Sequence, residues 1–189
     1  MKTQYACPNL RVLQLSWRKG ITDTFLDSVP LFLRKLQALD LSMCCITSRG
    51  CCTLSRSPSL REVNISACTG TNGEAIQALI TGKLVHTDID EFDCNQNGME
   101  KEIQLGLVKE RNSKSQLTSI TACFASEVDA NLFETMTTHA PHLKRLDLRK
   151  YHGNDLMKNL NSNAKSHLRQ LKSNGVGIAF STVYTSNEY

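Results

Sequence analysis

The decapeptide Lys35-Leu-Gln-Ala-Leu-Asp-Leu-Ser-Met-Cys44 carries leucine at positions 36, 39 and 41 and ends on a cysteine. Leu39 and Leu41 alternate with Asp40, which is the period of a half-buried β-strand and not that of a helix. The pattern returns in Ser59-Leu-Arg-Glu-Val-Asn-Ile-Ser-Ala-Cys68. A pattern that recurs at a regular interval indicates a repeat architecture, in which each unit buries its apolar side against the next.

Further units of this kind extend over most of the 189 residues. They begin, at intervals of 24 to 33 residues, at Leu10, Leu36, Leu60, Leu84, Leu117, Leu143 and, less regularly, Leu168. Near the end of the chain, residues 175–180 fit a strand better than the segment at Leu168 does. The sequence therefore predicts an α/β leucine-rich-repeat solenoid, a horseshoe arc of about six repeats with a parallel concave sheet and convex helices.

The repeat domain is expected to span residues 10–180, with an insertion near residues 93–116 in the fourth unit. Residues 1–9 are interpreted as the tail of an upstream repeat, so the chain is expected to be a shortened form of a longer protein. Residues 181–189 are polar and are expected to form a flexible C-terminal tail.

Three segments point to a particular repeat subclass: Cys7-Pro8-Asn9-Leu10-Arg11-Val12-Leu13, Leu39-Asp40-Leu41-Ser42-Met43-Cys44 and Gly20-Ile21-Thr22-Asp23. They resemble the cysteine-containing leucine-rich repeats of F-box substrate receptors in cullin ubiquitin ligases. The fourth and fifth units depart from the pattern, and no segment resembles an F-box. The resemblance implies substrate or partner binding in a ubiquitin-ligase complex, with the cullin-ligase adaptor bound through a missing N-terminal segment.

Side chains between the inward-facing strand residues are expected to point out of the concave sheet, because neighbouring strand residues alternate. Just past the strands, large apolar residues stand where polar residues would be easier to keep exposed, and aromatic residues are common interface anchors. The sequence thus predicts a partner-binding surface of Trp17, Met43, Asp40, Asn64, Asp88, Asp90, Phe124, Asp147 and Arg149. The alternative is that Trp17 and Phe124 tuck under a rim loop.

The first strand is expected to have a backbone edge with no partner in the chain, and open edges need a cover. The cover is expected to be a partner, an upstream repeat or a second copy.

The net charge of +4 is unevenly distributed, with acids between Asp88 and Glu102 and bases between Lys144 and Lys172. Two further hypotheses follow: a regulatory scaffold with no ligase link, and an RNA-binding module that uses the basic C-terminal repeats. The basic segment contains a single aromatic residue, Tyr151, for base stacking, which disfavours RNA and other nucleic acids as ligands.

The sequence contains no recognisable catalytic set, so we expect no enzyme activity, no cofactor and no metal site. The eight cysteines lack the paired spacing of structural zinc sites, and Cys44 and Cys68 occupy strand ends where a thiol can bond the turn. No run of eighteen apolar residues or signal-like N-terminus is present, so no membrane contact is expected. The predicted location is the cytoplasm or the nucleus, with the thiols mostly free.

Overall fold

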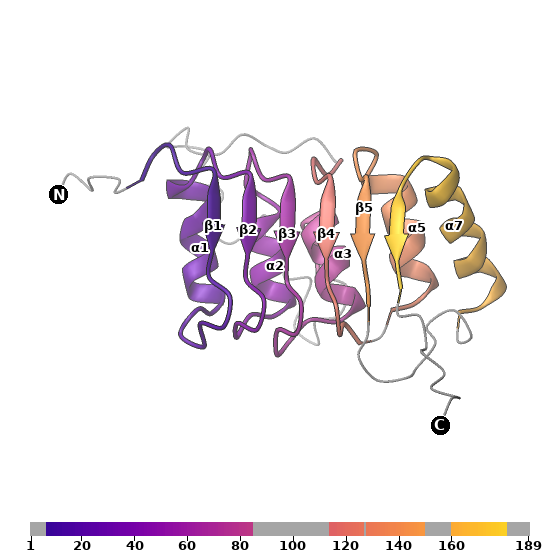
Figure 1. Cartoon of the computed structure of the whole chain (residues 1–189), viewed down its shortest axis with the longest axis horizontal. Helices are drawn as coiled ribbons and strands as arrows, with labels where there is room; N and C mark the ends of the chain where they lie inside the picture. The colour runs from indigo at the N-terminus through magenta and orange to yellow at the C-terminus, as the bar shows by residue number, and fades with distance from the viewer. Residues whose placement is uncertain (1–6, 85–113, 127, 150–159, 181–189) are drawn as a thin grey trace, which may run out of the picture.

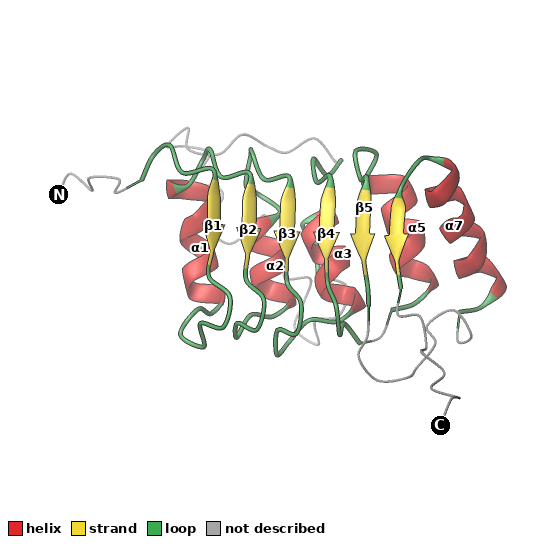
Figure 2. Ribbon diagram, viewed as in Figure 1, coloured by secondary structure: helices red, strands yellow, loops and turns green. Residues whose placement is uncertain are grey.

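The computed structural model describes residues 7–84, 114–126, 128–149 and 160–180, which form a sheet covered on one face by helices (Figures 1 and 2). The described strands are β1 (Val12–Gln14), β2 (Ala38–Asp40), β3 (Glu62–Asn64), β4 (Ser119–Thr121), β5 (Arg145–Asp147) and β6 (Gly177–Ala179). The described helices are α1 (Asp23–Phe32), α2 (Ser48–Leu54), α3 (Gly73–Thr81), α5 (Ala130–His139) and α7 (Ser162–Ser173).

All strands run parallel and lie side by side in chain order. Their central residues share one register position and point toward the helices: Leu13, Leu39, Val63, Ile120, Leu146 and Ile178. Leu39, Val63, Ile120 and Leu146 are 0 to 2 % exposed. The α/β class, the parallel sheet and the alternation of strand and helix confirm the predicted repeat arc.

The predicted place of the fourth unit is wrong. β3 pairs directly with β4, Val63 aligning with Ile120, so no strand containing Asp88 lies between them. Leu84 lies one repeat length after Leu60, which made it a plausible start for the fourth unit. In the structure, the next strand of the sheet belongs to the unit that starts at Leu117. The predicted seventh unit at Leu168 is also wrong, because Leu168 and Leu171 are buried on α7, while the alternative strand at residues 175–180 is present as β6.

Short polar side chains start four of the described helices, and at α2 the Thr47 hydroxyl accepts from the backbone amide of Arg49 at 3.3 Å. Asn72, Asp129 and Asn161 accept hydrogen bonds from the backbone amides of Ala75, Leu132 and Ala164 at 2.9, 3.0 and 2.8 Å, which satisfies amides that have no partner within the helix. At α1 the arrangement differs, because Asp23 accepts from the backbone amide and hydroxyl of Thr47 in the next unit, at 2.9 and 2.6 Å. This contact joins the starts of α1 and α2.

Two cysteines connect successive turns as the sequence predicted. The Cys44 thiol donates to the carbonyl of Leu15 at 3.2 Å, and the Cys68 thiol donates to that of Leu41 at 3.0 Å. Burial raises the pKa of Cys44 above its ordinary value and that of Cys68 to about 11, which keeps both thiols protonated as donors. Six of the described cysteines are free thiols, whereas Cys52 is disulfide-bonded.

Candidate protein-recognition surface

A recurring turn after the strands positions four side chains along one edge of the sheet. Trp17, Met43, Ala67 and Phe124 all have positive φ angles, between 53 and 69°. This left-handed region costs residues other than glycine about 1–2 kcal/mol. We call these four residues the turn ridge.

Hydrogen bonds between units hold the turn ridge in place. The amides of Trp17, Met43, Ala67 and Phe124 each donate at 2.9 Å to a carbonyl of the following unit, those of Ser42, Ser66, Cys123 and Arg149 respectively. The bonds extend the sheet beyond its strands. The backbone conformation therefore follows from the stacking of the repeats and not from local side-chain preference.

The ridge side chains are open to solvent. Trp17 is 74 % exposed, Met43 37 % and Phe124 42 %, so the alternative in which Trp17 and Phe124 tuck under a rim loop does not apply. Large apolar side chains that a rigid backbone holds in water are suited to anchor a protein partner. Each member of the ridge lies three residues after the end of its strand, so the ridge runs along the edge of the sheet where the strands end.

The predicted polar column has a structural task as well. Asp40, Asn64 and Asp147 accept a hydrogen bond from the amide two residues later, at 2.9, 3.1 and 3.2 Å. These bonds begin the turn in three units. One oxygen of each group is thus engaged, and the side chains are half-buried, not fully exposed as the alternation alone suggests.

Asp147 and Arg149 form the strongest charge pair on this face. The Arg149 guanidinium donates to both carboxylate oxygens of Asp147, at 2.9 Å from Nε and 2.7 Å from Nη2. Partial burial by itself raises the pKa of Asp147, but the hydrogen bonds from Arg149 outweigh it and lower that pKa below its ordinary value. The Cys123 thiol donates to the same carboxylate at 3.3 Å, and burial raises its pKa, so Cys123 is not an activated nucleophile.

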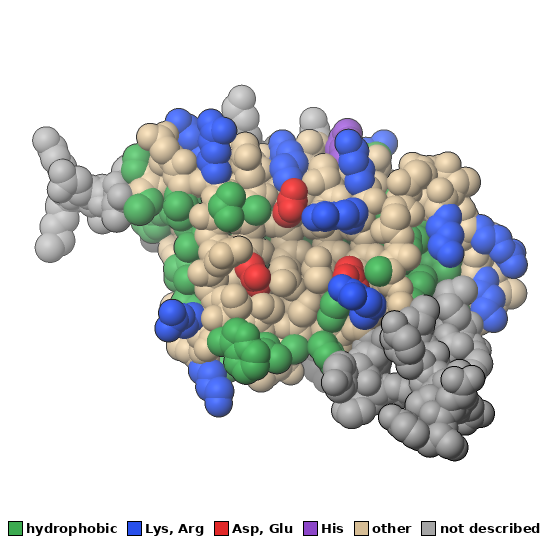
Figure 3. Space-filling model, viewed as in Figure 1, with side chains coloured by type: hydrophobic (Ala, Val, Ile, Leu, Met, Phe, Trp, Pro, Cys, Tyr) green, Lys and Arg blue, Asp and Glu red, His purple; other side chains and the backbone are tan. Residues whose placement is uncertain are grey.

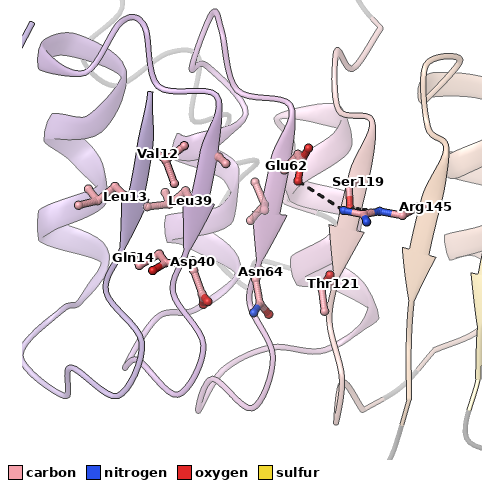
Figure 4. Close-up of a pocket in the computed structure, with 12 residues that line it drawn as sticks. Val12, Leu13, Gln14, Leu39, Asp40, Glu62, Asn64, Ser119, Thr121 and Arg145 are labelled. Carbon is pink, nitrogen blue, oxygen red and sulfur yellow. Dashed lines mark hydrogen bonds and ion pairs between the residues drawn. The ribbon is translucent and has the colours of Figure 1, made fainter. Parts of the chain in front are cut away.

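The first outward position of the strands also contributes, although we did not predict it as a binding column. Glu62, Ser119 and Arg145 align across β3, β4 and β5. Arg145 reaches over the sheet, donating to the Ser119 hydroxyl at 3.3 Å and to the Glu62 carboxylate at 3.4 Å (Figure 4). Aligning the repeat units would have shown these residues in one row.

Figure 4 shows a shallow hollow over β1 to β5. Its outward-facing lining combines an apolar end at Val12 and Ala38 with a polar remainder: Gln14, Asp40, Glu62, Asn64, Ser119, Thr121 and Arg145. A continuous face of mixed chemistry, open along its length, suits an extended protein surface better than a small molecule.

The predicted site residues fall into three groups. Trp17, Met43 and Phe124 lie on the turn ridge, and Asp40, Asn64, Asp147 and Arg149 lie beside it on the concave face. Asp88 and Asp90 lie outside the described residues. Their predicted place in line between Asn64 and Thr121 is wrong, since those two residues are direct neighbours.

Among the described residues of the basic C-terminal units, both arginines on this face are already paired. Arg145 is paired with Glu62, and Arg149 is paired with Asp147. Lys144, at the start of the basic segment, is exposed and has no ion pair among the described residues. Phosphate binding would compete with both existing pairs.

In the described part of the chain, no three His, Cys, Asp or Glu residues are grouped to hold a metal ion. The described helices include none with the length and apolar character needed to cross a bilayer.

Comparison with known proteins supports the repeat. The family model described as Leucine Rich repeat matches residues 32–55, which contain the end of α1, β2 and α2. No match was found among curated proteins. Repeats of this kind stack into extended binding surfaces and are typically non-catalytic. Residues 32–55 are thus a leucine-rich repeat, set within a six-stranded parallel sheet.

Proposed function

We propose that this chain is a protein-recognition module that binds its partner along the turn ridge and the adjoining concave face. The observation that carries the proposal is the equivalent placement of Trp17, Met43 and Phe124, which are held exposed by backbone bonds between units. The apolar anchors would supply contact area, and the neighbouring Asp40 and Asn64 would supply hydrogen-bond acceptors that fix the register.

Affinity capture with quantitative partner identification tests this function. The triple variant Trp17→Ala, Met43→Ala and Phe124→Ala removes the ridge anchors, and we expect it to lose the proteins that the unchanged chain retains. The matched control is a second triple variant, in which alanine replaces three exposed residues of the convex helices: Thr24, Gln170 and Lys172. The proposal would be contradicted if the unchanged chain, the ridge variant and the control variant all retained the same partner proteins equally. Thermal melting checks that the ridge variant is folded.

We further propose that the partner belongs to a cullin ubiquitin ligase, for which this chain presents a substrate. The support is the resemblance of its cysteine-containing repeats, in which Cys44 and Cys68 bond the preceding turn. Enrichment of a cullin adaptor among the captured proteins is the expected result. Capture of other proteins without any ligase component would favour a regulatory scaffold.

A further inference from the structure

A second row of residues lies at the opposite edge of the sheet, where the strands begin. One residue precedes each of β1 to β5, and the strand register makes these positions equivalent: Arg11, Gln37, Arg61, Thr118 and Lys144. We call these residues the start row. Bases alternate with uncharged polar residues along it. The start row shares no residue with the turn ridge or with the lining of the concave hollow.

Backbone hydrogen bonds between units fix the start row. The Arg61 carbonyl accepts from the amides of Thr118 and Ser119, at 2.8 and 3.1 Å. The carbonyls of Arg11, Gln37 and Thr118 each accept from two amides of the next unit in the same way. Neighbouring strands are about 4.8 Å apart, so the row is about 19 Å long from its first member to its last. The fold therefore sets the spacing of the bases in this row.

Further bases lie at the same edge, in the segments that lead from the helices into the strands. Arg34 and Lys35 follow α1, and Lys83 follows α3. Lys114 lies near the end of α5, to which the amide of the adjacent Ser115 donates at 2.7 Å. Together with the bases of the start row they form what we call the basic edge: Arg11, Arg34, Lys35, Arg61, Lys83, Lys114 and Lys144. All are exposed except Arg61, which is half-buried. Figure 3 shows blue side chains along the upper rim of this face, where the strands begin.

The described acids do not neutralise the basic edge. Glu62 is the single described carboxylate where the strands begin, and it pairs with Arg145, which is not a member of the edge. The other described acids lie on or beside the helices or where the strands end: Asp23, Asp27, Asp40, Glu74, Asp129, Glu134 and Asp147. No member of the basic edge has an ion pair with a described residue. Bases held in one line repel each other, and an oppositely charged ligand removes that repulsion.

The ends of the helices explain only part of the basic edge. Bases beside the last turn of a helix complement the partial negative charge there, which accounts for Arg34 and Lys83. Arg61 and Lys144 instead lead directly into β3 and β5. The Arg61 guanidinium donates through Nη1 to the carbonyl of Leu60 at 3.0 Å and not to a described carboxylate. These inner bases of the start row are therefore suited to meet an anionic group from outside.

We propose that the basic edge binds an acidic segment of a partner protein, which lies across the repeat units. A narrow line of fixed cations about 19 Å long matches about six residues of an extended chain, since each residue adds about 3.3 Å. The Gln37 side chain, between two bases of the start row, can bond the backbone of the segment. The start row contains no aromatic side chain on which a nucleic-acid base could stack, which favours a protein segment over RNA. This surface is separate from the concave-face site of the proposed function.

The test measures the fluorescence anisotropy of a labelled ten-residue peptide in which glutamate and serine alternate. We expect a saturable rise in anisotropy when the chain is added. The affinity should fall as salt is added, because salt screens the interaction between exposed charges. A matched peptide with lysine in place of glutamate should not bind.

Paired charge reversals show whether binding depends on position or only on net charge. Arg34→Glu with Lys144→Glu reverses two exposed members of the basic edge and should weaken peptide binding at least about tenfold. Arg18→Glu with Lys19→Glu makes the same change in net charge on exposed residues at the opposite edge of the sheet, and should change the affinity less than about twofold. Arg34→Lys with Lys144→Arg keeps both charges and should retain the affinity.

Each of four results would overturn the proposal. The first is the absence of saturable binding, and the second is an equal loss of affinity in the edge variant and the control variant. The third is tighter binding of a single-stranded RNA of the same charge, which would assign the edge to nucleic acid. The fourth is peptide binding that appears only after Asp88, Asp90, Glu91 and Asp93 are replaced by their amides, which would make the acidic segment of this chain the occupant.

The triple variant of the turn ridge separates this proposal from the proposed function. It should bind the acidic peptide as tightly as the unchanged chain does, because the basic edge lies where the strands begin and the ridge lies where they end. Loss of captured partners in the ridge variant and loss of the peptide in the edge variant are therefore independent results.

Discussion

Trp17, Met43, Ala67 and Phe124 share a backbone conformation that is usual for glycine, yet none of them is glycine. The sequence placed the large members of this set just past the strands but left open whether Trp17 and Phe124 face solvent or tuck under a rim loop, and their exposure decides for solvent. The positive φ could not be predicted, because its cause lies in the next unit: the amide of each residue reaches a carbonyl about 25 residues or more ahead in the chain. The identity of the side chain therefore does not predict this backbone hydrogen bond.

Ala67→Gly should raise the stability of the fold. Glycine relieves the left-handed strain at φ 53° while its greater freedom in the unfolded chain offsets part of the gain, leaving about 0.5–1 kcal/mol. The free energy of unfolding in urea is the measurement. Ala78→Gly, in the middle of α3, is the control and should destabilise. A loss of stability in both variants would contradict the strain argument.

Asp147 gives the stability a defined pH dependence. Its pKa is lowered in the folded chain, so its contribution is fully present above the unfolded value of 3.8 and is lost as the pH falls through the lowered folded pKa. The difference in unfolding free energy between the unchanged chain and Asp147→Asn should stay constant near neutrality and shrink below about pH 5. Arg149→Gln should show the same trend, because it removes the pairing group.

At the scale of single strands and helices, a buried core residue can stand directly beside a residue whose side chain starts the turn after the strand. Leu41 is 0 % exposed, and Asp40 beside it accepts the 2.9 Å bond from the Ser42 amide. The sequence alone assigns Asp40 to the outward face and predicts little cost for its removal. The hydrogen bond that starts the turn changes that expectation.

Leu41→Ala should destabilise the chain by about 2–5 kcal/mol, since it leaves a cavity in the repeat core. Asp40→Ala should cost about 0.5–1.5 kcal/mol, the value of one hydrogen bond. Urea denaturation of both variants is the measurement, with Thr24→Ala on the exposed side of α1 as control. Equal losses at positions 40 and 41 would mean that the strand register is wrong.

The strands around the fourth unit show where periodicity fails. Leu84 falls one repeat length after Leu60, and the acidic segment behind it resembles a degraded unit. Pairing of β3 with β4 depends on contacts between distant parts of the chain, and the spacing of leucines does not predict such contacts. Units without a long intervening segment, such as those at Leu36 and Leu143, were placed correctly.

Over the whole molecule, the ordering of six strands followed from the repeat, because each unit can bury its apolar residues only against its neighbours. The candidate surface was predictable in part, since alternation assigns the outward residues. The row of Glu62, Ser119 and Arg145 was missed, as was the pairing of Arg149 with Asp147. Both depend on which long side chains meet across strands.

Charge pairing leads to a prediction about nucleic acid. With Arg145 and Arg149 already paired, the chain should bind RNA no more tightly than a non-specific cationic surface does at physiological salt. Fluorescence anisotropy with a labelled single-stranded RNA, titrated at several salt concentrations, measures this. A tight complex that weakens steeply with salt and is lost on charge reversal at Lys144, Arg145 and Arg149 would make RNA the ligand.

The strands lie across the long axis of the molecule, so the hydrogen bonds between them run along that axis (Figure 1). Tension applied between the first and last units therefore pulls each bond along its own length. The hydrogen bonds of one strand can break before those of the next strand are loaded. In a sheet that is pulled parallel to its strands, by contrast, all hydrogen bonds between two strands bear the force at once. Under an optical trap this arc should extend in successive small steps at low force, one repeat at a time.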